Sequence, residues 1–281
     1  VDYFLAPSKF IKNKCVKFGI AANRIKILRN VLNFDNYEPC FEKDNYFLYS
    51  GRISEEKGVH KLVEAFSLLK KGNILKGHHL VIMGEGPQEA ELKKQAKKLN
   101  LKKEILFKGF QKKGSEKWTE INRKAKLNIL PSLWFDNSPV SISEAMAFGT
   151  VPLVSDRGGT KEMVEDGKSG IVYKAGSVEQ LSAELKKVIN GKYNLNKMQR
   201  ETVKRVREIN NEENYYKNLM GIYQELVETN KGNSTGALKR KLYPIRKAKR
   251  IYFAIYAFAL AVLLGLGGFA FLELEKQDFY A

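Results

Sequence analysis

The sequence contains few of the side chains that usually bind metals or carry out redox chemistry. Its 281 residues include two cysteines, Cys15 and Cys40, and three histidines, His60, His78 and His79. Neither set has the spacing of metal ligands or of a redox motif, so a metal centre and a dithiol site are both disfavoured. We expect the two thiols to be reduced, as in a cytosolic protein.

Acidic residues are also scarce. The chain has 49 Lys and Arg against 31 Asp and Glu, which gives a net charge of +18. Residues 231–250 hold eight of the basic residues and no acid. A basic balance favours nucleic acid, an anionic membrane or an anionic substrate as partner. No nucleic-acid-binding motif is present, so we expect no nucleic-acid partner.

An uncharged run of 22 residues, 251–272, follows that basic segment. A helix of that length extends about 33 Å, enough to cross the hydrocarbon core of a bilayer. We therefore predict a transmembrane helix at 251–272, with 231–250 as a basic linker on its cytoplasmic side. This predicts a single-pass anchor at the cytoplasmic face of the cell membrane. The alternative is a buried helix of a soluble domain.

The first residues, VDYFLAPSKF, contain neither an initiator methionine nor a signal peptide. They have the pattern of the middle of a domain, an apolar strand followed by a helix with a serine cap. We expect that an upstream part is missing and that residues 1–30 are the end of a truncated N-terminal domain.

Strands and helices alternate between residues 46 and 190. Short apolar runs predict buried strands, and amphipathic segments lie between them. The predicted strands are 46–50, 80–83, 105–107, 127–130, 151–155 and 170–173, and the predicted helices are 58–71, 87–99, 115–124, 139–148, 159–166 and 177–190. This alternation predicts an α/β fold with a doubly wound parallel sheet over 31–190, whose ligands bind at the carboxyl ends of the strands. Further helices are expected over 191–230.

The stretch DNSPVSISEAMAFG places Asp136 and Glu144 too far apart to be neighbours on one helical face. Asn137 or Ser138 can cap a helix that begins near Pro139. The free N–H groups of its first turn favour a phosphate. The two carboxylates would lie on either side of that phosphate and accept hydrogen bonds from hydroxyl groups. A nucleotide sugar has this layout. The alternative is a capped helix with two surface acids.

Two other segments point to the same edge of the sheet. SGRISEEKG places Arg52 and Lys57 after the first predicted strand, where cations would neutralise a diphosphate without a metal. SDRGGTKE supplies Gly158 and Gly159, which would let the backbone approach a ligand closely. The alternatives are surface charge and a flexible turn.

The segments GRISEEKG, VIMGEGP, FKGF and LPSLWFDNSPVSISEAMAFGTVPLVSDRGGTKEMVEDGKSGIVY together resemble the nucleotide-binding half of the retaining glycosyltransferases of family 4, which have the GT-B fold. The resemblance covers about residues 1–190. It implies an enzyme that transfers a glycosyl unit from a nucleotide-diphosphate sugar to an envelope glycan, lipid or protein acceptor, with retention of anomeric configuration, as in polysaccharide biosynthesis. No cofactor or metal is implied.

The resemblance also assigns roles to residues. Asp136 would face the donor sugar, Arg52 and Lys57 would hold the diphosphate, and Glu144 would bind the ribose. The other implied binding residues are Asn137, Ser138, Pro139, Val140, Gly51, Gly84, Gly86, Gly109, Phe110, Gly158 and Gly159.

The chain departs from the family pattern at Asp136, where the family has a glutamate. Because most of the acceptor domain is expected to be absent, we predict that this chain alone transfers sugar poorly or not at all. A non-catalytic nucleotide-sugar-binding module, a membrane scaffold and a nucleotide-sugar epimerase of the same fold remain alternatives.

Overall fold

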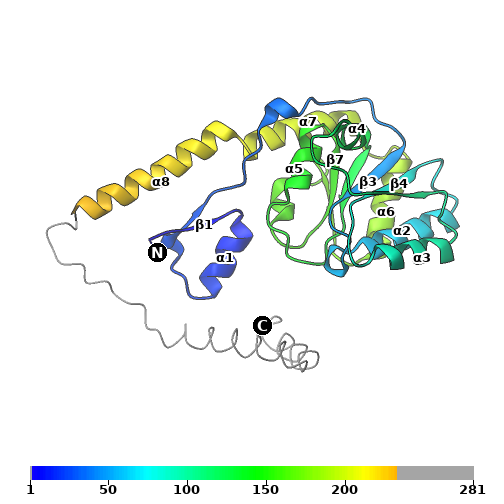
Figure 1. Cartoon of the computed structure of the whole chain (residues 1–281), viewed down its shortest axis with the longest axis horizontal. Coiled ribbons are helices and arrows are strands. Elements are labelled where there is room, and N and C mark those ends of the chain that lie inside the picture. Colours follow the sequence, from blue (N-terminus) through cyan, green and yellow to red (C-terminus); the bar gives the residue numbers. More distant parts are fainter. Residues whose placement is uncertain (1, 233–281) are drawn as a thin grey trace, which may run out of the picture. The chain divides into compact units, whose positions relative to one another are not determined.

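The computed structural model of the chain describes residues 2–232 (Figure 1). The chain divides into two compact units, Val1–Leu226 and Val227–Ala281. All described strands belong to the first unit, whereas the described part of the second is the end of helix α8 (Glu212–Gly232).

A six-stranded parallel sheet forms the centre of the first unit. Its strands are β3 (Tyr46–Ser50), β4 (His79–Met83), β5 (Ile105–Gly109), β6 (Leu127–Leu130), β7 (Val151–Ser155) and β8 (Ile171–Tyr173), in the order β5-β4-β3-β6-β7-β8. The chain winds outward from β3 to β5 and then returns to place β6 beside β3. The order reverses between β3 and β6, which is where open α/β sheets bind ligands.

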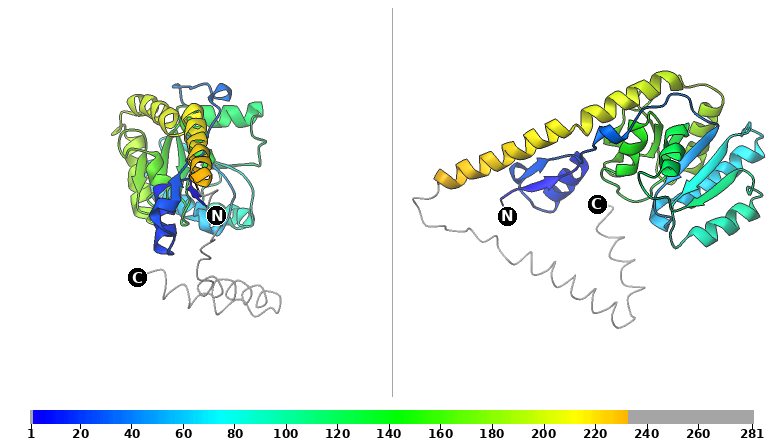
Figure 2. Two further views of the ribbon diagram at one scale, coloured as in Figure 1. Left: turned by 90° about the vertical axis from the view of Figure 1, so that its left-hand side faces the viewer. Right: turned by 45° about the horizontal axis from the view of Figure 1, so that its top comes forward.

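Helices cover both faces of this sheet (Figure 2). One hydrophobic cluster joins the sheet to α2 (Val59–Lys71), α3 (Glu89–Lys98) and α6 (Val178–Ile189). A second joins it to α4 (Glu116–Lys124), α5 (Val140–Ala147) and α7 (Leu195–Ile209). In β3, Phe47 and Tyr49 belong to the first cluster and Leu48 to the second, as the two-residue period of a strand requires. The predicted doubly wound parallel sheet is confirmed.

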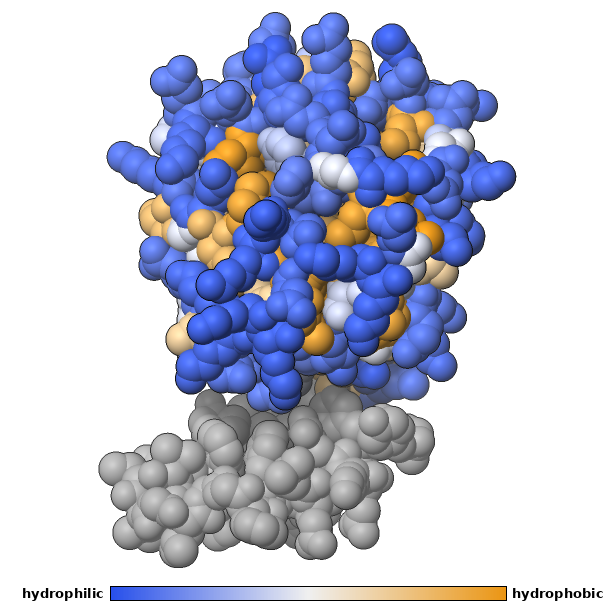
Figure 3. All heavy atoms as spheres, turned by 90° about the vertical axis from the view of Figure 1, so that its right-hand side faces the viewer, coloured by the Kyte–Doolittle hydropathy of each residue, from blue (hydrophilic) through white to orange (hydrophobic). Residues whose placement is uncertain are grey.

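The outer face of the molecule beside α3 is largely hydrophilic. Figure 3 shows this side, where hydrophobic side chains form small separate patches. Helix α3 buries Leu92 and Ala96 and otherwise consists mainly of Lys, Glu and Gln. It therefore contributes to the core along a narrow stripe and leaves its lysines in solvent.

The first residues form a small β-α-β segment. Strands β1 (Phe4–Ala6) and β2 (Ile25–Ile27) pair in parallel, with α1 (Lys9–Lys17) between them. The hydroxyl of Ser8 accepts a hydrogen bond from the Ile11 N–H at 3.2 Å, so the predicted serine cap is confirmed. The Glu162 carboxylate accepts from the N–H groups of Lys9 and Phe10 at 3.0 and 2.7 Å and thereby holds the start of α1.

The fold class predicted from the sequence was wrong in one element, because it included a C-terminal transmembrane helix. Among residues 2–232, no helix is long and apolar enough to cross a membrane. The segment 251–272, on which that prediction rested, lies outside the described residues. The fold of residues 2–232 is the α/β sheet with its helices.

One predicted helix is also shorter than expected. Residues Thr160–Met163 form a single 3-10 turn, η4, in place of a helix over 159–166. The side chain of Arg205 donates to the carbonyl groups of Glu162 and Met163, at 3.1 and 3.4 Å, where a longer helix would have used its own N–H groups.

Candidate active site

The loops that follow β3, β4 and β5 interlock at the carboxyl edge of the sheet. The N–H of Gly51 donates to the Met83 carbonyl at 3.0 Å, and the N–H of Gly84 donates to the Gly109 carbonyl at 2.9 Å. Gly84 has φ +140°, and a Cβ there would lie 1.9 Å from the Gly51 oxygen. The glycines therefore let these loops cross without a side chain between them.

A cavity of about 370 Å³ opens beside these loops. Four of the predicted site residues line it: Gly51, Arg52, Gly84 and Phe110. Its other lining residues, which the sequence did not single out, are Ser50, Met83, Glu85, Gln111, Lys113 and Trp118. Arg52 forms no ion pair with a carboxylate among residues 2–232, and its guanidinium remains available to an anion in the cavity.

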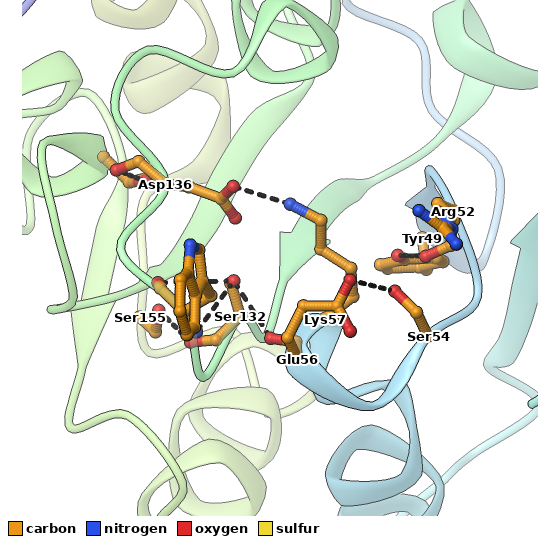
Figure 4. Close-up of polar contacts among 10 residues, drawn as sticks. Tyr49, Arg52, Ser54, Glu56, Lys57, Ser132, Asp136 and Ser155 are labelled. Atoms are coloured by element: carbon orange, nitrogen blue, oxygen red, sulfur yellow. Dashed lines mark hydrogen bonds and ion pairs between the residues drawn. The ribbon is translucent and has the colours of Figure 1, made fainter. Parts of the chain in front are cut away.

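Lys57 and Asp136 form an ion pair across the point where the strand order reverses. The Lys57 Nζ lies 2.6 Å from Asp136 Oδ1, and the exposed fractions of the two side chains are 25% and 14%. Figure 4 shows the two side chains pointing toward each other, with Arg52 on the other side of Lys57. The second carboxylate oxygen, Asp136 Oδ2, is buried and has no hydrogen-bond partner in the described part of the chain.

The loop after β6 is held in place by the turn that carries Lys57. That turn is η3 (Glu55–Lys57), and the Glu56 carbonyl accepts from the N–H groups of Leu133 and Trp134 at 2.8 and 3.2 Å. Gly58 has φ +65°, and a Cβ there would lie 2.2 Å from the Pro131 oxygen. These backbone contacts bring Asp136 within reach of Lys57 although 79 residues separate them.

The predicted cap of α5 is wrong. Pro139 is the N-cap residue and no side chain caps the helix. The Ser138 carbonyl accepts from Asn30 Nδ2 at 2.9 Å, and Asn137 Oδ1 is buried without a partner among residues 2–232. The contact with Asn30 holds the loop before α5 but does not satisfy the first N–H groups of the helix. Val140 begins α5 with a partly exposed side chain.

Glu144 lies in the second turn of α5 with a side chain that is 8% exposed. Its Oε1 is 2.5 Å from Lys113 Nζ and accepts from the Tyr37 hydroxyl at 3.3 Å. The hydrogen bond to Glu144 raises the pKa of Lys113, and burial raises the pKa of Tyr37. Both groups therefore keep their proton at neutral pH and donate hydrogen bonds to this carboxylate.

The close approach that Gly158 and Gly159 allow is to the protein's own backbone. The N–H of Gly159 donates to the Asp136 carbonyl at 2.8 Å. A Cβ at Gly158 would lie 2.3 Å from that same oxygen, and one at Gly159 would lie 2.4 Å from the Asn137 oxygen. Gly86 is similar, because a Cβ there would lie 2.1 Å from the Ile53 oxygen. In this structure these glycines position the site loops.

The sequence reasoning missed Tyr37 and Lys113, the two partners of Glu144. Lys113 belongs to the stretch QKKG after β5, and its place in a loop at the same sheet edge was the available signal. Tyr37 lies 107 residues from Glu144, in a segment without a motif. Among residues 2–232, no group of three or more His, Cys, Asp or Glu is placed to hold a metal ion.

Comparison with known proteins identifies the family. The sequence model of the family described as glycosyl transferases group 1 matches residues 33–208. The chain belongs to this family. The match spans the whole six-stranded sheet together with its helices, including the loops that carry Arg52, Lys57, Asp136 and Glu144.

Two curated relatives of this group 1 glycosyl transferase illustrate the similarity. Lipopolysaccharide 1,6-galactosyltransferase of Salmonella typhimurium is 27% identical over 197 residues, which are 68% of this chain and 53% of the relative. The amylovoran biosynthesis glycosyltransferase AmsK of Erwinia amylovora is 26% identical over 200 residues, which are 68% of this chain and 48% of the relative. The chain thus spans about half the length of the curated relatives it matches.

Among solved structures, the Anabaena protein HepE in complex with UDP superposes with a TM-score of 0.70 at 17% identity, over 81% of this chain and 64% of that chain. At this identity the likeness supports the fold. The predicted glycosyltransferase family with the GT-B fold is confirmed, whereas the assignment to family 4 and the retaining mechanism stay predictions.

Proposed function

We propose that this group 1 glycosyl transferase binds a nucleotide-diphosphate sugar at the carboxyl edge of its sheet and transfers the glycosyl unit to a glycan or lipid acceptor. The observation that carries the proposal is the arrangement around Asp136. Lys57 forms an ion pair with one of its carboxylate oxygens. The other oxygen is buried and has no hydrogen-bond partner among residues 2–232. By name, one relative is a lipopolysaccharide galactosyltransferase and the other a glycosyltransferase of amylovoran biosynthesis, which supports the acceptor class.

The diphosphate of the donor would be bound by Lys57 and Arg52. Both side chains lie on the loop after β3, and Arg52 lines the cavity. Charge develops on the leaving diphosphate as the glycosidic bond breaks, and cations fixed beside it would stabilise that charge. In this role they would take the place of a metal ion.

The donor sugar would lie over the loop that begins with Asp136. Asp136 Oδ2 and Asn137 Oδ1, on consecutive residues, are both buried and without partners in the described part of the chain. A buried acceptor without a donor is unfavourable, so hydroxyl groups of a sugar would satisfy both. Glu144, deeper in α5, would accept from the ribose hydroxyls.

We further propose that the transfer retains the anomeric configuration. The support is the resemblance of the site segments to retaining enzymes. The test is the anomeric coupling constant of the initial product, measured by NMR with the α-linked donor. An initial product of inverted configuration would exclude retention.

Nucleotide binding tests the diphosphate site directly. We expect Lys57→Met to weaken the binding of at least one of UDP, GDP and ADP about tenfold or more, because a charge-assisted contact is lost. The control is Lys93→Met, which removes a solvent-exposed lysine on α3. Isothermal titration calorimetry measures both variants. Equal effects of the two substitutions would reduce the role of Lys57 to general surface charge.

A binding module without transferase activity is the second candidate. The replacement of the expected glutamate by Asp136 favours it, since the shorter side chain has already engaged Lys57. Turnover separates the two candidates. In the full-length protein, hydrolysis or transfer of the donor that disappears in Asp136→Ala would establish catalysis, and binding by that protein without turnover would establish a module.

A further inference from the structure

Lys113 occupies the carboxylate to which the proposed function assigns the ribose. Its Nζ lies 2.5 Å from Glu144 Oε1 although its own side chain is 61% exposed. The Glu144 side chain is 8% exposed and accepts from Tyr37, whose ring packs edge to face against Trp118 and Phe148 with centroids 6.4 and 5.0 Å away. In such surroundings the carboxylate requires a donor partner, and Lys113 reaches in from solvent to provide one.

The loop that carries Lys113 has unobstructed hinges at both ends. Gly109 and Gly114 flank residues 110–113 with φ +63° and +78°. A Cβ at Gly114 would meet nothing within 4 Å, and one at Gly109 would meet only Glu85 Oε1 at 3.9 Å. At Gly84 a neighbouring backbone leaves no room for a side chain, whereas at Gly109 and Gly114 there is room. These two positions therefore require glycine for the positive φ of the loop backbone alone.

The ion pair is the link between this loop and α5. Within residues 2–232, residues 110–113 are otherwise bonded to Glu85, to β5 and to the N-cap of α4, where the Ser115 N–H donates to the Lys112 carbonyl at 3.0 Å. The Phe110 N–H donates to Glu85 Oε1 at 3.2 Å, and Gln111 Nε2 donates to the Lys108 carbonyl at 2.6 Å. Separating Lys113 from Glu144 would therefore free the loop from α5 without breaking the sheet.

We propose that Lys113 competes with the ribose of the nucleotide for Glu144 and so lowers the affinity of the nucleotide. The inference rests on the proposed function, which assigns Glu144 to the ribose. Lys113 holds Glu144 Oε1, so a ribose that uses both oxygens of this carboxylate requires Lys113 to withdraw and the loop 110–113 to swing away from α5. Each bound nucleotide therefore replaces one ion pair by hydrogen bonds from the sugar.

A consequence of this competition is selectivity for a ribose diol. Two adjacent hydroxyl groups can donate to both oxygens of a carboxylate and replace the lost ion pair, whereas a 2′-deoxyribose has a single hydroxyl to offer. Lys113 raises the requirement that a ligand must meet. Its removal is expected to raise the affinity of the ribonucleotide at least as much as that of the deoxyribonucleotide, because the ion-pair cost is removed for every ligand that uses Glu144.

The sign of the change in affinity distinguishes competition from simple attraction. Lys112 and Lys113 are neighbours on the same loop, and both Lys112→Met and Lys113→Met remove one positive charge. Attraction of an anionic nucleotide predicts weaker binding for both variants. We expect Lys113→Met to bind more tightly than the wild type, by about fivefold or more, because no ion pair has to be broken. Lys112→Met is expected to be unchanged or slightly weaker.

The experiment is calorimetric titration of the full chain with UDP, ADP and GDP and with their 2′-deoxy counterparts. Urea unfolding verifies that each variant is folded. Unchanged or weaker binding by Lys113→Met would overturn the proposal while leaving the proposed function standing. Failure of all the nucleotides to bind the wild type would instead remove the proposed function, and the competition with it.

A double-mutant cycle supplies a second measurement. Glu144→Gln is expected to weaken binding of the ribonucleotide. When Lys113→Met is added to Glu144→Gln, its effect on affinity should disappear, because the competition needs the carboxylate. An equal gain in affinity in both backgrounds would show that Lys113 acts elsewhere and would contradict the proposal.

Discussion

Gly84 lies where the loop after β4 passes the loop after β3, and no side chain fits there. Its backbone has φ +140°, and a Cβ would come within 1.9 Å of the Gly51 oxygen. Its N–H is bonded to the Gly109 carbonyl, so the residue cannot move away without losing a contact between strands. Conformation and space both require glycine at this position.

We predict that Gly84→Ala lowers the free energy of unfolding by about 2 to 4 kcal/mol, because it combines a strained φ with a backbone clash. Gly114→Ala is the matched control, with a positive φ but open space around it. We expect it to lower the free energy of unfolding by about 1 kcal/mol. Urea titration measures both. Equal losses would mean that the clash relaxes at no cost.

The candidate site was predictable where its residues lie in contiguous motifs. Lys57 and Asp136 were identified because each follows a recognisable strand, and the edge of a parallel sheet collects such residues. Lys113 and Tyr37 were missed because their role depends on the position of Glu144 in the folded chain. The function of Gly158 could not be read from its motif either, since a glycine admits a ligand and a neighbouring loop equally well.

Among the helices, the C-terminal ends of α4 and α5 are both hydrogen-bonded to the side chain of Lys43. Lys43 Nζ donates to the Arg123 carbonyl at 2.7 Å, to the Phe148 carbonyl at 3.0 Å and to the Thr150 hydroxyl at 2.9 Å. The last carbonyl groups of a helix have no intrahelical donor and carry partial negative charge. Lys43 satisfies one such group in each helix and so fixes their ends relative to each other.

We predict that Lys43→Met lowers the free energy of unfolding by about 1 to 3 kcal/mol, because buried carbonyl groups lose their donor. Lys102→Met, at an exposed lysine before β5, is the control and should have little effect. Thermal or urea unfolding at pH 8 measures the difference. A loss no larger than that of the control would mean that water replaces the lysine without penalty.

The pH dependence of this difference has a definite sign. Burial lowers the pKa of Lys43 from 10.5 to about 7. Between these values the unfolded chain binds more protons than the folded chain, so the contribution of Lys43 to stability increases with pH. The stability of the wild type relative to Lys43→Met is expected to rise between about pH 7 and pH 9. A constant difference across this range would contradict the assignment.

The strands were easier to predict than the short helical segments. Strands such as Leu127–Leu130 are apolar runs buried on both faces, so local composition identifies them. The segment after β7 has helical composition, yet it forms a single 3-10 turn, since Arg205 takes its carbonyl groups. A contact between distant segments thus accompanies the shorter helix.

At the scale of the whole molecule, charge acts on stability and on ligand binding in opposite directions. The chain carries a net charge of +18, so its positive groups repel one another in the folded state. The same field would attract the proposed anionic nucleotide sugar to the cationic loop of Arg52 and Lys57. Salt screens both effects over a distance of about 10 Å at 0.1 M ionic strength.

We therefore predict that raising NaCl from about 0.05 to 0.3 M increases the free energy of unfolding and weakens nucleoside diphosphate binding a few-fold. Calorimetric titration and urea unfolding in the same buffers measure the two quantities. Replacing Lys102 and Lys103 by glutamate, on the surface before β5, lowers the net charge by four, and the stabilisation by salt should then be smaller. If the free energy of unfolding falls with salt in the wild type, local ion pairs such as Lys57–Asp136 outweigh the net repulsion, and the fold depends on attraction between charges more than its composition indicates.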